Sequence, residues 1–233
     1  AAENQYKFVD VYYCDENGKN SPWKRIDVAN LPTFQREEAK DFNCFATVQQ
    51  YANESKVEGE DFTAPLYFDL DYEQDPTVAQ KEAIKLIDFF TKELDIKETD
   101  LHVYFSGSKG FHIIIDERAL SIKPRNDLHK AYKHIAGYLR YRLGDISKVI
   151  DEDGKEVEHT EPLKAIDLVV YTVKRMLRLP YSRHQKTGLY KIELSVTELN
   201  TLTLDEIKER AKVGAVPADR LDGEEAKSIR RRP

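Results

Sequence analysis

Hydrophobic and polar residues follow one another along the chain in patterns that predict both strands and helices. Short alternating or continuous apolar runs predict strands at residues 8–13, 65–71, 101–105, 111–115, 165–170 and 191–196. Apolar residues at helical spacing predict helices from Asp75-Pro76 to Leu94, from Asn126 or Asp127 to near Gly144, and over 203–213. Residues 34–51 fit either element, and the polar residues 151–155 indicate a turn or a small insertion. The order of elements predicts an α+β fold in which a helix layer covers a mostly antiparallel sheet.

The length of the chain bounds its domain organisation. The 233 residues suffice for one large domain or two small ones. We expect one domain over residues 1–213, made of a leader (1–60) and a core (61–200) that carries the motifs described below. The polar tail 214–233 is expected to be poorly ordered. Apolar runs are only a few residues long, so none is expected to span a bilayer, and no secretory signal is visible.

The charge and the cysteine content of the chain limit the classes of function that we expect. The net charge of −6 argues against a protein that coats DNA non-specifically. Basic side chains are nevertheless concentrated in residues 118–148 and 171–191, whereas acids gather elsewhere, for example at 69–75. Such a chain can hold cations in one place and phosphates in another. The two cysteines, Cys14 and Cys44, are too few for a four-cysteine zinc site or a disulfide framework, and a cytoplasmic protein is expected.

Two acids stand at the end of the strand predicted over 65–71. Because side chains alternate along a strand, Asp69 and Asp71 share one face with Tyr67, about 6.7 Å apart along the chain. A divalent cation between such carboxylates would relieve their repulsion, and Mg²⁺ binds a few carboxylates together with substrate phosphates. The alternative is a solvated strand end with two surface acids.

A second motif lies at residues 106–112, Ser-Gly-Ser-Lys-Gly-Phe-His. Its glycines permit a tight turn that exposes backbone N–H groups, while Ser106, Lys109 and His112 supply a hydroxyl, a cation and an imidazole. Such a turn could hold a triphosphate. It is not a Walker A motif, and a simple hairpin turn with a half-buried histidine is the alternative.

Two further features of the sequence are candidates for a functional site. Asp167 stands in an apolar run, where a buried acid needs a hydrogen-bond partner or a metal unless it lies at a strand end or helix cap. The basic run from Arg175 to Gly188 would, as an extended chain, present Ser182, His184 and Lys186 on one face. That face suits an anionic ligand, and a solvated basic loop is the alternative.

Together the four features resemble the catalytic core of the archaeo-eukaryotic primase superfamily. Residues 67–71, Tyr-Phe-Asp-Leu-Asp, are similar to its acidic first motif, residues 106–112 to its second, and Ile166-Asp167 to its third acid. The run 175–188 is especially similar to the corresponding run of archaeal primase small subunits. The resemblance covers about residues 65–195.

The resemblance implies a fold and a set of roles. The fold is an RRM-like catalytic sheet unit packed against an N-terminal α/β unit, with the active site in the cleft between them. The acids Asp69, Asp71 and Asp167 would be catalytic residues and ligands of two Mg²⁺ or Mn²⁺ ions. Seven residues would contact the incoming nucleotide: Ser106, Lys109, His112, Arg178, Ser182, His184 and Lys186. Basic neighbours are expected to bind nucleic acid: Lys174, Arg175 and Arg183.

These roles predict a template-dependent nucleotidyltransferase, a DNA primase or primase-polymerase. It would make or extend primers on single-stranded DNA from nucleoside triphosphates, ribo- or deoxy-, by a two-metal mechanism. Its partners would be a helicase or other replication, repair or defence proteins, with no membrane involved. No zinc is expected, because two cysteines and scattered histidines supply no obvious zinc-binding insertion. This departure from many replicative relatives favours a compact primase-polymerase of a mobile element, a defence system or a repair system.

Three other functions stay open at this point. A gap-filling or end-joining repair polymerase of the same superfamily would require a primer. A metal-dependent glycosyltransferase also uses Asp-x-Asp, to hold a nucleotide diphosphate, although the second motif and the run 175–188 argue against it. A non-catalytic nucleic-acid-binding module with the same fold would have no need of the intact acids.

Overall fold

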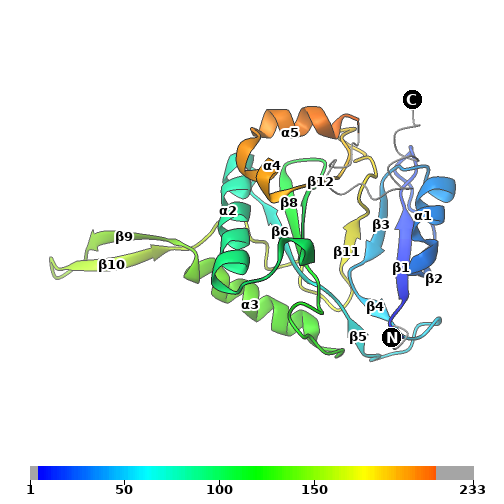
Figure 1. The fold of residues 1–233 in the computed structure, drawn as a ribbon, viewed down its shortest axis with the longest axis horizontal. Helices are drawn as coiled ribbons and strands as arrows, with labels where there is room; N and C mark the ends of the chain where they lie inside the picture. The colour runs from blue at the N-terminus through cyan, green and yellow to red at the C-terminus, as the bar shows by residue number, and fades with distance from the viewer. Residues whose placement is uncertain (1–4, 214–233) are drawn as a thin grey trace.

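A computed structural model of the chain describes residues 5–213. Two antiparallel sheets lie side by side, and helices cover their outer sides (Figure 1). The predicted α+β fold is confirmed. The tail predicted over 214–233 lies outside the described residues. None of the described helices has the length and apolar character needed to cross a membrane.

The central sheet carries the residues of the first two motifs. Its strand order is β12-β7-β8-β6, and its strands are β6 (Leu66–Asp71), β7 (Leu101–Phe105), β8 (Gly110–Ile115) and β12 (Ile192–Leu194). Side chains alternate along each strand, so the sheet has one apolar face. The residues of this face are almost completely buried: Phe68, Leu70, Val103, Phe105, Phe111, Ile113, Ile192 and Leu194.

Helix α2 (Pro76–Asp88) covers this apolar face. It begins where the sequence predicts, because the Asp75 side chain accepts a hydrogen bond from the Thr77 N–H and Pro76 occupies the first turn. The helix continues into a π-helical turn, η3 (Phe89–Glu93), where Phe90 packs against Phe68 with ring centroids 5.8 Å apart. The helix predicted to end near Leu94 is therefore an α-helix with a π-helical last turn.

Three more helices surround the central sheet: α3 (Leu128–Arg142), α4 (Val196–Thr201) and α5 (Leu204–Ala211). The Tyr132 ring of α3 packs edge-on against Tyr67 of β6. A short 3-10 turn, η4 (Glu98–Asp100), precedes β7. Helices α4 and α5 each begin with a capping box, built by Ser195 and by Thr203. The sequence pattern predicted α3 and α5 but not α4, which is too short to show helical periodicity.

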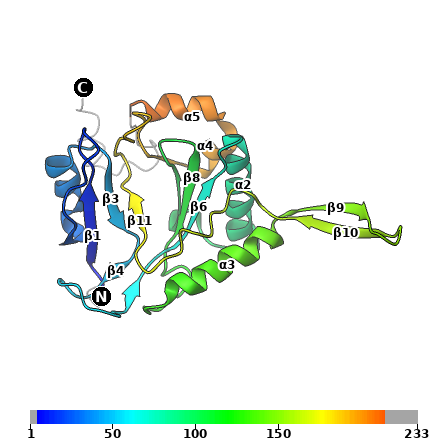
Figure 2. The same ribbon diagram turned by 180° about the vertical axis from the view of Figure 1, so that it is seen from behind.

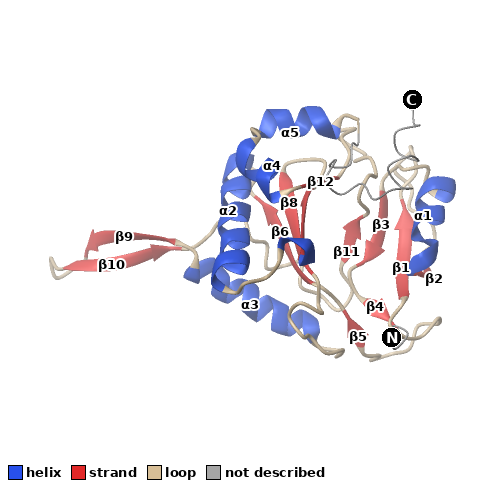
Figure 3. Ribbon diagram, viewed as in Figure 1, coloured by secondary structure: helices blue, strands red, loops and turns tan. Residues whose placement is uncertain are grey.

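The N-terminal sheet has the strand order β11-β3-β1-β4-β5, with β2 beside β1 (Figure 3). Its strands are β1 (Phe8–Tyr13), β2 (Lys24–Asp27), β3 (Cys44–Thr47), β4 (Gln50–Tyr51), β5 (Phe62–Thr63) and β11 (Met176–Arg178). One face forms a small core with the short helices η1 (Val28–Asn30), α1 (Leu31–Thr33) and η2 (Phe34–Glu38). Both cysteines are buried and are not joined by a disulfide.

Strand β11 joins the two halves of the molecule. It belongs to the basic run 175–188, yet it pairs with β3, so that Arg178 lies opposite Phe45. After β11 the chain returns to the central sheet as β12. The basic run is therefore carried on the N-terminal sheet and faces the acids of β6.

The prediction of a strand over residues 165–170 is wrong. Residues 165–167 run along the edge of β6, where the Asp71 N–H donates to the Ala165 carbonyl and the Asp167 N–H to the Asp69 carbonyl, each at 2.9 Å or less. The pairing stops there, because the Asp167 side chain accepts a hydrogen bond from the Val169 N–H and bends the chain.

Two strands that the sequence analysis did not predict form a projecting hairpin. Strands β9 (Asp145–Ile150) and β10 (Glu156–Glu161) pair with each other alone and extend away from the body of the molecule (Figure 2). The predicted turn at 151–155 connects them. Nearly every residue of the hairpin is exposed, including Ile146 and Ile150.

Removing the hairpin should leave the fold stable. Replacing residues 146–160 with a short Gly-Ser linker deletes almost no buried surface, and Asp145 and Glu161 are paired neighbours that a short linker can join. We expect the free energy of unfolding to change by less than about 1 kcal/mol. Denaturant unfolding followed by circular dichroism measures it. The core substitution Phe90→Ala, expected to cost about 3–5 kcal/mol, is the reference. If the deletion lowered the free energy of unfolding as much as Phe90→Ala does, the hairpin would support the core.

Candidate active site

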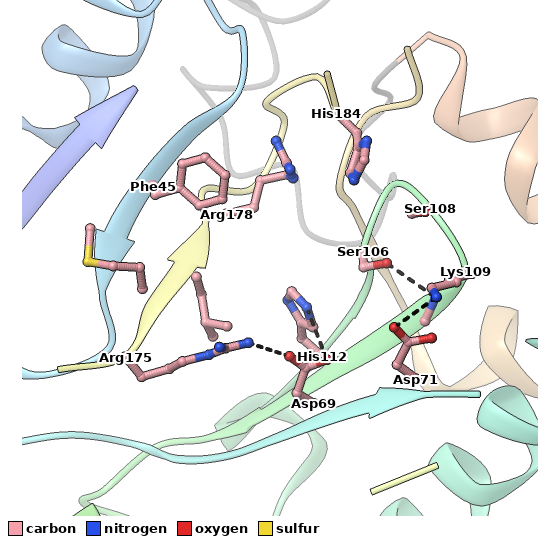
Figure 4. Close-up of a pocket in the computed structure, with 13 residues that line it drawn as sticks. Phe45, Asp69, Asp71, Ser106, Ser108, Lys109, His112, Arg175, Arg178 and His184 are labelled. Atoms are coloured by element: carbon pink, nitrogen blue, oxygen red, sulfur yellow. Dashed lines mark hydrogen bonds and ion pairs between the residues drawn. The ribbon is translucent and has the colours of Figure 1, made fainter. Parts of the chain in front are cut away.

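Two acids project from the face of β6 that is opposite the apolar core. Asp69 pairs in register with His112 of β8, and Asp71 pairs with Gly110. The side chain of Asp69 is 16% exposed and that of Asp71 is 43% exposed. The prediction that both acids share one strand face is confirmed. Figure 4 shows them on one side of a pocket.

The turn between β7 and β8 needs its two glycines. Gly107 has a φ of +86°, which favours glycine. A Cβ atom on Gly110 would lie 2.2 Å from the Leu70 carbonyl oxygen, so any side chain there would push β8 away from β6. The turn places the Ser106 hydroxyl at the pocket and returns the Lys109 ammonium to within 3.6 Å of the Asp71 carboxylate.

Basic residues approach the acids from the N-terminal sheet. The Arg175 guanidinium donates a hydrogen bond of 2.6 Å to the Asp69 carboxylate. The Arg178 guanidinium lies over the Phe45 ring and donates to the Asn43 side-chain oxygen. Because β11 belongs to the opposite sheet, the cations and the acids meet across the space between the two sheets.

This space is a pocket of about 240 Å³ whose lining comes from both sheets: Phe45, Asp69, Asp71, Ser106, Ser108, Lys109, Gly110, His112, Arg175, Met176, Leu177, Arg178 and His184. Two buried polar atoms in it, His112 Nδ1 and Arg175 Nε, have no hydrogen-bond partner among the described residues. Buried polar groups are normally paired, so these two atoms of the lining residues are exceptions in the described part of the chain.

The third acid lies next to the first. The backbone N–H of Asp167 donates to the Asp69 carbonyl at 2.9 Å, which brings the two residues side by side at the edge of the sheet. Glu82 of α2 holds this segment in place, since its carboxylate accepts hydrogen bonds from the backbone N–H groups of Lys164 and Ala165 at 2.7 and 2.8 Å. Asp167 is therefore close to the other acids although it is not part of a strand.

The three acids are neighbours but do not form a ready-made metal centre. Within residues 5–213, no three His, Cys, Asp or Glu side chains are arranged to hold a metal ion. Asp69 is instead directed to Arg175, and Asp71 to Lys109. Their chemistry still fits a divalent cation, because carboxylate oxygens are the ligands that Mg²⁺ and Mn²⁺ prefer.

Burial and neighbouring charges shift the pKa values of two residues in the pocket, Asp69 and His112. Burial raises the pKa of Asp69, with the Asp167 and Asp71 carboxylates adding to the rise and Arg175 opposing it. Burial also lowers the pKa of His112 well below its usual value, helped by nearby lysine and arginine cations. A further cation would therefore favour the charged form of Asp69, and His112 is a neutral imidazole at physiological pH.

The basic run after β11 departs from the predicted extended chain. Tyr181 has a φ of 60°, and residues 184–188 form a turn closed by the Gly188 N–H and the His184 carbonyl. As a result Ser182, His184 and Lys186 do not share a face. Of the three, only His184 lines the pocket. Burial and the neighbouring Arg178 and Lys186 cations lower the pKa of His184 to about 4, so its ring is neutral.

The remaining predicted residues lie around the pocket rather than in it. Ser182 is buried, and its hydroxyl donates to the Leu179 carbonyl at 2.8 Å. Lys186 and Arg183 are exposed, and Arg183 lies over the Phe42 ring. Lys174 pairs with Asp10 at 2.5 Å. The structure thus brings most of the predicted set together in the pocket lining and leaves these four, and also Asp167, outside it.

Sequence reasoning missed several residues of the site, among them Ser108, Met176 and Leu177 of the pocket lining, and two others are instructive. Phe45 lines the pocket, but it lies in residues 34–51, whose pattern was ambiguous. Glu82 was overlooked although a signal existed: it shares the buried helical face with Ala79, Ala83 and Leu86, where an acid needs hydrogen-bond partners.

Replacing Lys191 with Met should change how stability depends on pH. Burial lowers the pKa of Lys191 to about 7, from its ordinary value of 10.5. Between these values the unfolded chain binds more protons than the folded chain, so this residue makes the wild type more stable as the pH rises, by at most about 1.4 kcal/mol per pH unit. Denaturant unfolding measures the free energy of unfolding of both proteins. Between about pH 7 and about pH 9, the wild type should become more stable relative to Lys191→Met. A difference independent of pH would contradict the lowered pKa.

Comparisons with known proteins agree with this architecture. Among solved structures, the polymerase domain from Mycobacterium tuberculosis Ligase D in complex with DNA matches with a TM-score of 0.52 at 15% sequence identity, covering 94% of this chain and 85% of that chain. The chain therefore shares the fold of that polymerase domain.

The sequence comparisons are more specific. The model of the family described as DNA primase small subunit matches residues 68–196. The DNA primase small subunit PriS of Pyrobaculum calidifontis is 34% identical over 138 residues, which are 52% of this chain and 44% of that protein. PriS of Archaeoglobus fulgidus is 26% identical over 196 residues, which are 62% of this chain and 58% of that protein. The chain spans about half the length of these curated relatives.

Because the family match covers more than half of the chain, the chain belongs to the DNA primase small subunit family. The resemblance to the archaeo-eukaryotic primases is thereby confirmed. This membership separates the chain from the glycosyltransferases that also use an Asp-x-Asp motif.

Proposed function

We propose that the chain is the catalytic part of a template-dependent nucleotidyltransferase, a DNA primase or primase-polymerase. It would make or extend primers on single-stranded DNA from nucleoside triphosphates. The observation that carries the proposal is the pocket shared by the two sheets, in which Asp69 and Asp71 face Arg175 and Arg178. Membership in the DNA primase small subunit family supports it.

The acids are the proposed holders of two divalent metal ions, Mg²⁺ or Mn²⁺. Asp69, Asp71 and Asp167 would supply the carboxylate oxygens. When bound, the ions would activate the attacking hydroxyl and neutralise the charge that builds up on the triphosphate. The Arg175 guanidinium now donates a hydrogen bond to the Asp69 carboxylate. With a cation held by Asp69, this guanidinium would be available to a phosphate oxygen.

The pocket residues with N–H and O–H groups are the proposed contacts of the incoming nucleotide. These residues are Ser106, Lys109, His112, Arg178 and His184. Because both histidines are neutral, they would act as hydrogen-bond donors and leave the positive charge to the Lys and Arg side chains. The predicted contacts Ser182 and Lys186 would act indirectly, since the Ser182 hydroxyl is used to fix the backbone after β11.

The template is the proposed nucleic-acid partner. Lys174 and Arg183 lie outside the pocket lining and Arg175 lies in it, and the three would neutralise phosphates of the template. A helicase or other replication, repair or defence proteins stay predicted partners, and the cytoplasm stays the predicted location.

Nucleotide incorporation on single-stranded DNA tests the proposal. The purified chain is incubated with Mg²⁺ or Mn²⁺ and labelled NTP or dNTP, with and without an annealed primer. Product without a primer supports a primase, whereas product only with a primer supports the gap-filling or end-joining repair polymerase. DNA binding with no incorporation under either condition would refute both and leave a non-catalytic nucleic-acid-binding module.

A further inference from the structure

A row of stacked aromatic rings crosses the N-terminal sheet on the face that turns towards the pocket. Tyr12 of β1 and Phe45 of β3 are paired in register, with ring centroids 4.8 Å apart and planes inclined by 10°. Trp23, the residue before β2, stacks on the other side of Tyr12 at 5.0 Å and 9°. The aromatic row is therefore Trp23–Tyr12–Phe45, three nearly parallel rings, two on neighbouring strands and one directly before β2.

The core of the N-terminal sheet does not account for this row. The apolar core lies on the opposite face, around Val9, Val11 and Cys44. The aromatic row stays accessible, and Trp23, the single tryptophan of the chain, is 49% exposed. A large ring held rigidly at a surface, with a face that no core residue covers, is available for stacking on a ligand.

Cations stand at both ends of the aromatic row. The Lys174 ammonium lies 4.5 Å from the centroid of the Trp23 ring, and the Arg178 guanidinium lies 4.7 Å from that of Phe45. Aromatic rings interleaved with cations are the combination that binds single-stranded nucleic acid, because the rings stack on bases while the cations contact phosphates. Bases within a duplex stack on each other, so their faces are not available to such a row.

The aromatic row begins at the pocket. Phe45 and Arg178 line the pocket together with Asp69 (Figure 4). Tyr12 and Trp23 lie outside its lining, so the row leads from the pocket outwards across the sheet. A strand of several nucleotides with one end in the pocket would extend along this row.

We propose that the aromatic row binds unpaired bases of a single-stranded nucleic acid and guides the strand to the pocket, with a base stacked on Trp23 and a phosphate near Lys174. This inference rests on the proposed function, for which the strand is the template. Lys174 also contacts the Asp10 carboxylate at 2.5 Å, and this ion pair holds its ammonium beside the Trp23 ring.

The single tryptophan allows a direct test. The chain is titrated with a single-stranded oligothymidylate, without metal ions or triphosphates, while Trp23 fluorescence and the polarisation of a label on the oligonucleotide are recorded. We expect the oligonucleotide to quench Trp23 as it binds, and a blunt duplex of the same length or thymidine triphosphate alone to quench it far less. In the polarisation assay, Trp23→Ala should weaken binding about tenfold or more, and Trp23→Phe should weaken it less.

The control is Tyr138→Ala, which removes an exposed ring from α3, far along the chain from the aromatic row. It should leave oligonucleotide binding unchanged, and thermal unfolding should verify that each variant is folded. Binding without quenching in the wild type, or unchanged affinity in Trp23→Ala, would overturn the inference while leaving the proposed function standing. Absence of any binding to the single strand would overturn both. Quenching combined with no incorporation in the primer assay would support the inference and refute the proposed function.

Discussion

The double substitution Asp69→Ala, Asp71→Ala should abolish nucleotide incorporation, with a loss of about a thousandfold or more. The proposed ligands of the metal ions are removed, and with them the neutralisation of the charge that builds up on the triphosphate. The fold should survive, because both side chains lie on the pocket face of β6, and because the change removes the Asp69 carboxylate, whose pKa is raised by burial and by the neighbouring carboxylates. Incorporation on primed and unprimed templates measures the activity, and calorimetric titration with Mn²⁺ measures metal binding.

The matched control is Asp88→Asn. The Asp88 side chain is 44% exposed at the end of α2, where it pairs with Lys92 one helical turn away. It should leave incorporation and Mn²⁺ binding unchanged. If the double variant kept incorporating nucleotides, the assignment of the acids would be wrong, and if it lost activity because it unfolded, circular dichroism would reveal it.

Substitution of the buried Glu82 by Ala should reduce both stability and activity. The carboxylate is 6% exposed and is the hydrogen-bond acceptor for two backbone N–H groups of the segment that leads to Asp167. Without it these two donors lose their partners, and the expected cost is about 3 kcal/mol in the free energy of unfolding. Asp167 would lose its fixed position beside Asp69, so incorporation should fall even at temperatures at which the variant is folded.

Two comparisons separate these effects. Glu82→Gln keeps the size and one acceptor oxygen, so it should lie between the wild type and Glu82→Ala in both stability and activity. Lys81→Ala changes the neighbouring exposed residue and should affect neither. Unchanged unfolding and unchanged incorporation in Glu82→Ala would show that the segment around Asp167 is held by other contacts.

Local patterns in the sequence were sufficient for the elements of the central sheet. The alternation over residues 65–71 predicted a strand with Asp69 and Asp71 on one face, and Asp75-Pro76 predicted the start of α2. These features depend on neighbours in the chain: strand alternation, an N-cap and proline in the first turn. The projecting hairpin was missed for the converse reason. Its strands have no buried face, so no apolar periodicity marks them.

The site was less predictable than the strands that carry it. The basic run 175–188 was recognised as an anion-binding feature, but its shape was not, because Tyr181 in the left-handed region and the turn at 184–188 break the extended chain. Asp167 was expected in a strand, whereas backbone hydrogen bonds to β6 and Glu82 hold it in an irregular segment. In both places contacts between distant residues outweigh the local preference of the chain.

The sequence by itself determined the chemistry of this protein: a pair of acids on one strand, a glycine turn with lysine and histidine, and a basic run, in the order typical of primases. Only the tertiary structure decided how these parts meet. Strand β11 has three residues and pairs with β3, about 130 positions earlier in the chain, and this pairing, with the contacts of Val48 and Gln49 to the Arg175 backbone, brings Arg175 and Arg178 to the pocket that Asp69 also lines. Pairing between strands depends on packing across the whole molecule, and no local pattern of hydrophobic and polar residues encodes it.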